Sequence, residues 1–322
     1  MTLISVTGKI MVERGKKLRI VFMGTPEFAV PSLQVLLEHD YNMVAVVTAP
    51  DKPAGRGMQL QQSAIKKFAI ENGLKVLQPV KLKDPSFLNN LKELKPDLQI
   101  VVAFRMLPEL VWQLPTIGTF NLHGSLLPQY RGAAPINWAI INGETETGVT
   151  TFFLQHEIDT GKILFQEKIA IGENETAGML HDRMKLVGAA LVLKTVQAIE
   201  TESYPQIAQQ ENSDLRKAPK LFNANCSIDW QQPVSVIFNQ IRGLSPYPAA
   251  YTLLNGKVLK ILSAKKIIAQ HMITAGAITT DGKTFLHFAA ADGFIAVETL
   301  KMEGKKQMEV KEFLRGFRFD NG

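Results

Sequence analysis

The segment "LRIVFMGTPEFAVPSLQVLLEHD", residues 18–40, decides the fold class of this chain. Its first seven residues form an apolar run that ends on Gly24, which is typical of a strand buried on both faces. The residues that follow have helical spacing, and Thr25 and Pro26 suit the cap and the first turn of a helix. A buried strand that leads directly into a helix is the first half of a β-α-β unit.

The same alternation continues through the first half of the chain. Apolar strands are predicted at residues 43–50, 75–79 and 97–104, and helices at 63–73 and 86–96. The strands are continuously apolar, which indicates a parallel sheet covered by helices on both faces. We therefore predict a doubly wound, mostly parallel α/β sheet. Ligands of such sheets bind beyond the carboxyl ends of the strands, so the segments after the strands are candidate binding loops.

The pattern changes after residue 203. Residues 204–222 are polar with few periodic apolar positions, so we predict a linker there. Residues 223–322 then contain one helix and several short strands, with Asn255-Gly256 as a hairpin turn, which predicts a small β-barrel. The expected organisation is a flexible tail at 1–17, with Met11 as an alternative start, a catalytic domain at 18–203, the linker and the barrel.

The composition is that of a globular protein of two domains. Hydrophobic residues make up 46% of the 322 residues and charged residues 20%. No apolar run approaches the roughly 18 to 20 residues that a membrane-spanning helix needs, and the N-terminus lacks the features of a secretory signal. Cys226 is the single cysteine, which excludes internal disulfides and favours a reducing cytoplasm.

The positive charge is concentrated in the second half of the chain. The net charge is +6, and residues 206–322 contain 15 Lys and Arg against 10 Asp and Glu, leaving 21 against 20 for residues 1–205. A basic second half suits a polyanionic partner such as nucleic acid. A lysine-rich solvated surface would explain the charge equally well.

Three common functions of α/β sheets are disfavoured by missing motifs. The first turn, "MGTPEF", has one glycine where the dinucleotide-binding G-x-G-x-x-G loop has three. The G-x-x-x-x-G-K-[ST] loop of nucleotide triphosphatases is absent as well. No G-x-S-x-G elbow surrounds Ser125, which makes this serine a poor candidate for a hydrolase nucleophile.

A more coherent set of polar residues lies in "FNLHGSLLP" and, 36 residues beyond His123, in "IDTG". The amide of Asn121 can donate to an oxyanion, and the imidazole of His123 can exchange a proton. Asp159 can hold the imidazole in one tautomer or favour its charged form. Together the three suit acyl transfer to an amine. Each of them alone is explained as readily by a structural role in a turn or in the core.

These motifs resemble a known family from about residue 18 to the C-terminus. "NLHGSLLPQYRGAAPINWAI" with "IDTG" is similar to the folate-dependent formyltransferases, and "GTPEFAVP" with "DKPAGRG" resembles their tRNA-specific branch. The resemblance implies a Rossmann-like formyltransferase domain followed by an OB-like barrel that binds tRNA. It also implies transfer of the formyl group of 10-formyltetrahydrofolate to the α-amino group of methionine on initiator Met-tRNA, with no metal.

The resemblance further implies roles for individual residues. Asn121, His123 and Asp159 match the family's catalytic trio. The turn that binds folate is matched by Ser125, Leu126, Leu127 and Pro128. Relatives line the same pocket with the residues at Phe104, Arg105 and Met106, although "FRML" departs from the Tyr-Gly that many of them carry.

Contacts to tRNA are implied for two basic segments. Residues 50–57 match a loop that meets the acceptor end of tRNA, where Lys52 and Arg56 suit phosphates or an unpaired base. Lys217 and Lys220 in the linker are further candidates for phosphate contacts. A monomer is expected, because one chain engages the tRNA.

Two alternatives remain open at this stage. The chain could be another member of the superfamily, which formylates glycinamide ribonucleotide or an amino sugar, or which hydrolyses the formyl-folate. It could instead be a non-catalytic RNA-binding protein that keeps the fold. Retention of all three residues of the trio argues against the second alternative, since RNA binding alone does not need them.

Overall fold

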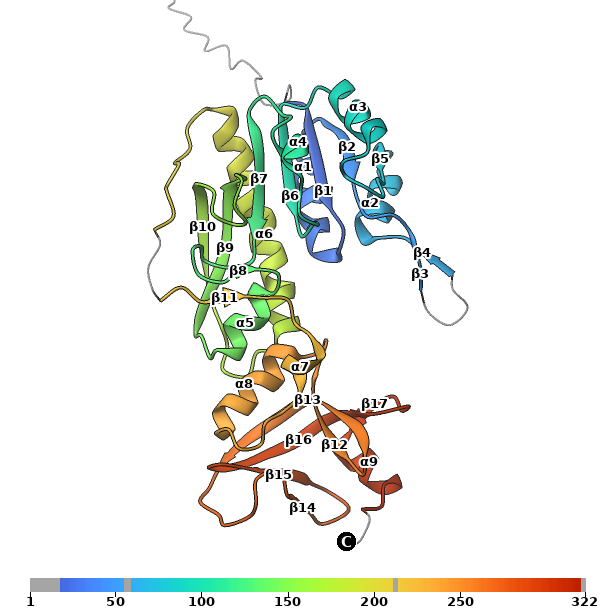
Figure 1. Ribbon diagram of the computed structural model, residues 1–322, viewed down its shortest axis with the longest axis vertical. Helices are drawn as coiled ribbons and strands as arrows, with labels where there is room; N and C mark the ends of the chain where they lie inside the picture. Colours follow the sequence, from blue (N-terminus) through green and yellow to red (C-terminus); the bar gives the residue numbers. More distant parts are fainter. Residues whose placement is uncertain (1–17, 55–58, 211–213, 320–322) are drawn as a thin grey trace, which may run out of the picture.

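The computed structural model describes residues 18–54, 59–210 and 214–319. The chain forms two units, one built around a seven-stranded sheet and one around a smaller curled sheet (Figure 1). The tail predicted at residues 1–17 lies outside the described residues.

The larger sheet has the strand order β10-β9-β7-β6-β1-β2-β5. Its five parallel strands are β1 (Ile20–Gly24), β2 (Met43–Val47), β5 (Val76–Leu77), β6 (Leu98–Val102) and β7 (Gly118–His123). Two antiparallel strands, β9 (Glu146–Phe153) and β10 (Ile163–Ala170), extend the sheet beside β7. The prediction of a mostly parallel sheet is confirmed.

Helices cover both faces of this sheet. Ile20 and Phe22 of β1 pack with α1 (Val30–Glu38), α2 (Ala64–Glu71) and α6 (Ala177–Glu200). The alternate residues Val21 and Met23 pack on the other face with α3 (Pro85–Glu93) and α4 (Glu109–Trp112). Burial on both sides is the reason why these strands are continuously apolar in sequence.

The first helix begins later than its sequence indicates. A short 3-10 turn, η2 (Glu27–Ala29), follows the strand with Pro26 at its N-cap, so Thr25 is not the cap. The helix α1 then begins at Val30 and carries a proline in its first turn, where no backbone N–H is needed.

A separate hairpin projects from the side of the sheet (Figure 1). It consists of β3 (Lys52–Ala54) and β4 (Gln59–Gln61), which pair antiparallel. Residues 55–58, which include Arg56, lie outside the described residues.

The second unit is a six-stranded antiparallel sheet that curls into a half-barrel. Its strands are β12 (Ala250–Leu254), β13 (Lys257–Ile268), β14 (Ile278–Thr280), β15 (Leu286–Ala290), β16 (Gly293–Met302) and β17 (Gln307–Glu309). Two helices, α8 (Val234–Leu244) and α9 (Val310–Gly316), pack on the core of this sheet. Asn255 and Gly256 have φ of 48° and 70°, as the predicted two-residue hairpin turn requires.

The two units share a packed interface. The helix α8 crosses α5 (Pro135–Ile141) of the first unit so closely that a Cβ on Gly243 would lie 2.9 Å from the backbone nitrogen of Ile141. Arg242 of α8 is buried there and donates to the carbonyls of Gly172 and Glu175, both at 3.3 Å. Burial lowers the pKa of this guanidinium.

The described parts of the segment between the units, residues 204–210 and 214–222, pair with the first unit, which their polar sequence did not reveal. Ile207 pairs through its backbone with Ile163 at the start of β10. Further on, β11 (Lys217–Ala218) pairs parallel with β8 (Arg131–Gly132), and α7 (Asn223–Cys226) leads into the second unit. Backbone pairing of this kind imposes no apolar periodicity on the side chains. Within the described residues, none of the helices has the length and apolarity needed to span a bilayer.

Candidate active site

A cleft of about 730 Å³ opens at the carboxyl ends of β6 and β7. It lies at the edge of the sheet where the strand pattern predicts ligands to bind. Six of the residues singled out in the sequence line it: Phe104, Arg105, Met106, Asn121, His123 and Asp159. The structure thus brings together residues that are up to 55 positions apart.

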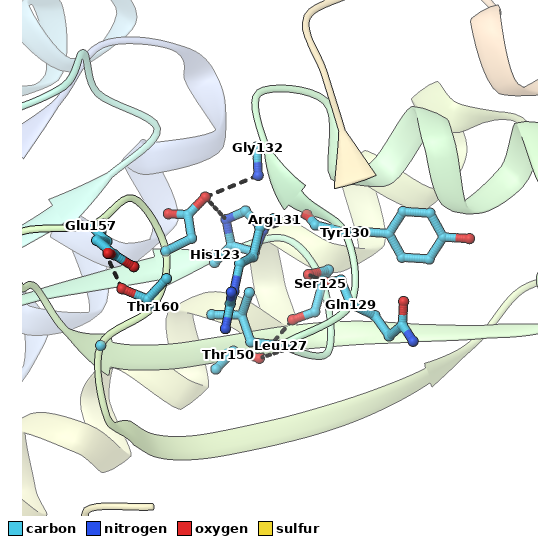
Figure 2. Close-up of polar contacts among 12 residues, drawn as sticks. His123, Ser125, Leu127, Gln129, Tyr130, Arg131, Gly132, Thr150, Glu157 and Thr160 are labelled. Atoms are coloured by element: carbon cyan, nitrogen blue, oxygen red, sulfur yellow. Dashed lines mark hydrogen bonds and ion pairs between the residues drawn. The ribbon is translucent and has the colours of Figure 1, made fainter. Parts of the chain in front are cut away.

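His123 is the last residue of β7 and is only 6% exposed. Its Nε2 lies 2.9 Å from the carbonyl oxygen of Tyr130 (Figure 2). Because a carbonyl can only accept a hydrogen bond, Nε2 carries the hydrogen in the neutral ring. The other nitrogen, Nδ1, therefore has a free lone pair.

Asp159 stands opposite this nitrogen, on the loop between β9 and β10. Its Oδ2 accepts a hydrogen bond from the backbone N–H of Gly132 at 3.0 Å and lies 3.9 Å from Nδ1 of His123 (Figure 2). The second distance is too long for a hydrogen bond but is close enough for an ion pair with a protonated imidazole. Asp159 adopts a φ of 56°, in the left-handed region that residues other than glycine seldom adopt.

Asn121 lies two residues before His123 on β7, between Val101 of β6 and Phe152 of β9. Its Oδ1 is buried and has no hydrogen-bond partner among the described residues. Buried polar atoms are nearly always paired, so this oxygen is an exception among the side chains that line the cleft. The alternation of a β-strand places Asn121 and His123 on the same face.

The turn after His123 is held by its own hydrogen bonds. Ser125 Oγ donates to the carbonyl of Gln129 at 2.6 Å, and Thr150 Oγ1 donates to the carbonyl of Ser125 at 2.6 Å (Figure 2). The backbone N–H of Leu127 donates in turn to Thr150 Oγ1 at 3.1 Å. The result is a rigid turn that presents the Tyr130 carbonyl to His123.

The residues of this turn lie behind the cleft. Ser125 and Leu127 are buried, and Leu126 lines a separate pocket of about 300 Å³ with Glu144 and Arg216. Pro128 likewise is not among the residues that line the main cleft. The folate contact that the family resemblance implies for these four residues stays a prediction.

One wall of the cleft is the loop after β6. Arg105 donates to the backbone carbonyls of Pro79 and Val80, the latter at 2.8 Å, and its guanidinium lies 5.6 Å from the centre of the Phe104 ring. Partial burial lowers the pKa of Arg105. These contacts join the loop to the segment that follows β5. Met106, which is 74% exposed, lies at the rim of the cleft.

Another wall of the cleft, the loop that carries Asp159, is held in place by Gln209, a residue that sequence reasoning missed. The side chain of Gln209, in the segment between the units, donates to the carbonyl oxygens of Asp159 and Gly161, both at 2.8 Å. Its Oε1 accepts from Nε and Nη2 of Arg131, at 3.0 and 2.8 Å. Nothing in the polar sequence around Gln209 distinguishes it from its neighbours.

None of the described residues predicted to contact tRNA lines the cleft. Lys52 is exposed on β3, and Arg56 lies outside the described residues. Lys217 is exposed on β11, and the ammonium of Lys220 stands 5.6 Å from the centre of the exposed Phe222 ring. Across the described part of the chain, no group of three or more His, Cys, Asp and Glu side chains could hold a metal ion.

Comparison with known proteins matches both units to one family. Residues 18–196 match the formyl transferase model, and residues 220–318 match the formyl transferase C-terminal domain. The methionyl-tRNA formyltransferase of Bacteroides thetaiotaomicron is 53% identical over 313 residues, which cover 95% of this chain and 97% of the relative. The enzyme of the same name from Parabacteroides distasonis is 55% identical over 94% of this chain and 96% of its own length.

The fold recurs in more distant solved structures. A sugar 3N-formyl transferase, solved with dTDP and 5-N-formyl-THF, superposes with a TM-score of 0.66 over 90% of this chain and 99% of its own, at 23% identity. HypX from Aquifex aeolicus, solved with tetrahydrofolic acid, gives a TM-score of 0.64 at 18% identity, over 94% of this chain and 48% of that one. At such identities the likeness shows the fold alone. On the matches along its whole length, this chain belongs to the formyl transferase family and, within it, to the methionyl-tRNA formyltransferases.

Proposed function

We propose that this protein transfers the formyl group of 10-formyltetrahydrofolate to the α-amino group of methionine on initiator Met-tRNA, for translation initiation. The observation that carries the proposal is the convergence of Asn121, His123 and Asp159 on one cleft. The substrates are supported by relatives of that name that are more than half identical over nearly the whole chain.

The first step is attack of the amine nitrogen on the formyl carbon. A carbon–nitrogen bond forms, and the π electrons of the formyl carbonyl move onto its oxygen. Asn121 donates from its amide to this oxyanion, as a donor fixed in advance on a rigid strand.

The second step moves a proton. Because the Tyr130 carbonyl holds the hydrogen on Nε2, the lone pair of His123 Nδ1 takes the proton that the amine nitrogen must lose. The ring then carries a positive charge, and the carboxylate of Asp159, at 3.9 Å, stabilises it. His123 returns the proton to N10 of the folate as the carbon–N10 bond breaks, which yields the formamide and tetrahydrofolate.

The cleft has a size suited to the folate. Ligand pockets have volumes of about 300 to 1,000 Å³, and the cleft here has about 730 Å³. We assign the pterin to the space between Phe104, Met106 and the loop that carries Asp159. A folate contact for the turn formed by Ser125, Leu126, Leu127 and Pro128, which does not line this cleft, is proposed separately, on the family resemblance alone.

The tRNA is assigned to the basic parts of the chain. In the proposal, residues 18–203 perform the chemistry, 204–222 link the domains, and 223–322 support the tRNA. Lys52 and Arg56 contact the acceptor end, and Lys217 and Lys220 contact phosphates. The protein acts as a monomer in the cytoplasm, where charged tRNA is available.

The test is formyl transfer from 10-formyltetrahydrofolate to methionine-charged initiator tRNA, with methionine-charged elongator tRNA in parallel. We expect transfer to the initiator. Absence of transfer to either tRNA, with folate still bound, would overturn the assigned acceptor and direct attention to small-molecule amines or to water.

A further inference from the structure

The loop that carries Asp159 is fixed from the segment between the two units. The backbone carbonyls of Asp159 and Gly161 both accept a hydrogen bond from the side-chain amide of Gln209. The oxygen of the same amide accepts two hydrogen bonds from the guanidinium of Arg131. Both amide hydrogens and both lone pairs of one side chain are therefore used in joining three segments.

Gln209 is itself held on both sides along the chain. Two residues earlier, Ile207 exchanges backbone hydrogen bonds with Ile163, at 2.8 and 3.0 Å. Eight residues later, β11 begins its pairing with β8. Backbone hydrogen bonds close to Gln209 in the chain therefore hold the backbone from which its amide reaches the Asp159 loop.

The Asp159 loop needs such support because its conformation is not intrinsically favoured. A φ of 56° lies in the left-handed region, which aspartate enters more readily than most residues but which still costs free energy relative to the right-handed region. The carboxylate of Asp159 has one backbone donor, that of Gly132, and its distance to His123 depends on where the loop backbone stands. Movement of this carboxylate by about 1 Å would already cost catalysis.

We propose that Gln209 is a positioning residue, whose amide sets the place of the Asp159 carboxylate relative to His123. The proposal rests on the function assigned above, because it gives Asp159 a part in proton transfer. It makes the segment between the two domains a component of the active site rather than a passive connection.

Two substitutions separate positioning of Asp159 from anchoring of the linker. Gln209→Glu keeps the size of the side chain and an acceptor for Arg131, but it removes the N–H donors to the loop carbonyls. Gln209→Met removes both kinds of contact. The matched control is Gln210→Glu, a substitution of the same chemistry at the exposed neighbouring residue.

The kinetic measurement is the split between kcat and KM. For Gln209→Glu we expect kcat of formyl transfer to fall by roughly 10-fold to 100-fold, with the KM of both substrates and Tm close to the wild type. In a background of Asp159→Asn the same substitution should have little further effect, because both act through one carboxylate. The control Gln210→Glu should match the wild type.

A second measurement does not depend on which amine is the acceptor. Hydrogen exchange followed by mass spectrometry should show faster exchange of the amides of residues 154–161 in Gln209→Glu, and unchanged exchange in the core strands. If the wild type formylates neither tRNA, the proposed function fails while this arm still tests the positioning of the loop.

The proposal is overturned by any of three results. The first is a wild-type kcat in Gln209→Glu together with a reduced kcat in Gln209→Met. The contact with Arg131 would then be the one that matters, and Gln209 would only anchor the linker. The second is a loss of kcat that multiplies fully with that of Asp159→Asn. The third is unchanged exchange in residues 154–161.

Discussion

Replacement of Asn121 by alanine tests the oxyanion role of its amide. Asn121 Oδ1 has no hydrogen-bond partner among the described residues. Replacement of the side chain by a methyl group therefore deprives no protein donor of a hydrogen bond to this oxygen. We therefore expect the free energy of unfolding to change by less than about 1 kcal/mol. In contrast, loss of one preorganised donor to an oxyanion costs about 2.7 to 4 kcal/mol of transition-state stabilisation, or roughly 100-fold to 1000-fold in kcat.

The assay is the initial rate of formyl transfer to charged initiator tRNA at saturating folate, with urea unfolding of the same preparation. Asn121→Asp is the matched control, because a carboxylate keeps the shape of the amide but cannot donate a hydrogen bond at neutral pH. It should lose at least as much kcat as the alanine variant. A kcat within a few-fold of wild type in either variant would refute the assigned role, and a loss of kcat that follows a loss of stability would refute the structural reasoning.

Three further predictions concern the tRNA loop, a glycine at the active site and a partly buried carboxyl. Arg56→Ala should raise the KM for charged tRNA and leave folate affinity intact, because the arginine is assigned to the acceptor end; weaker folate binding in a titration would contradict this. Gly132→Ala should lower the unfolding free energy by about 2 kcal/mol or more, since Gly132 has a φ of 128° and a Cβ would lie 2.4 Å from the Ala218 carbonyl oxygen. Gly282→Ala, with a φ of 70° and open space around it, measures the cost of a positive φ without a clash, and equal losses in urea unfolding would exclude the clash. Burial raises the pKa of Glu200, whose Oε1 has no hydrogen-bond partner among the described residues. The free energy of unfolding therefore falls as the pH rises from the usual carboxyl pKa through the raised one, because the native state must then hold the charged carboxylate. Glu200→Gln should therefore stabilise the protein at pH 7 by less than about 1 kcal/mol and lose this advantage below pH 4.5, the unshifted carboxyl pKa; a stability difference that does not change with pH would count against the charge as the cause.

The sequence by itself determined the fold class and the core of the site. The apolar strands predict a parallel sheet because burial on both faces leaves no polar alternation, and the structure has that sheet. The hairpin at Asn255-Gly256 was predictable because few residues adopt two successive positive φ angles. Asn121 and His123 could be placed together because alternate residues of a strand point to one face.

Only the tertiary structure decided how that site is completed. The distance of 3.9 Å between Asp159 and His123, and the Tyr130 carbonyl that assigns the hydrogen to Nε2, depend on how two loops meet. Gln209 was invisible in the sequence because its hydrogen bonds run to backbone carbonyls, which every residue carries, across 48 and 50 positions of the chain. A pattern in sequence records the periodicity of an element, whereas contacts between loops follow from the packing of all the elements at once.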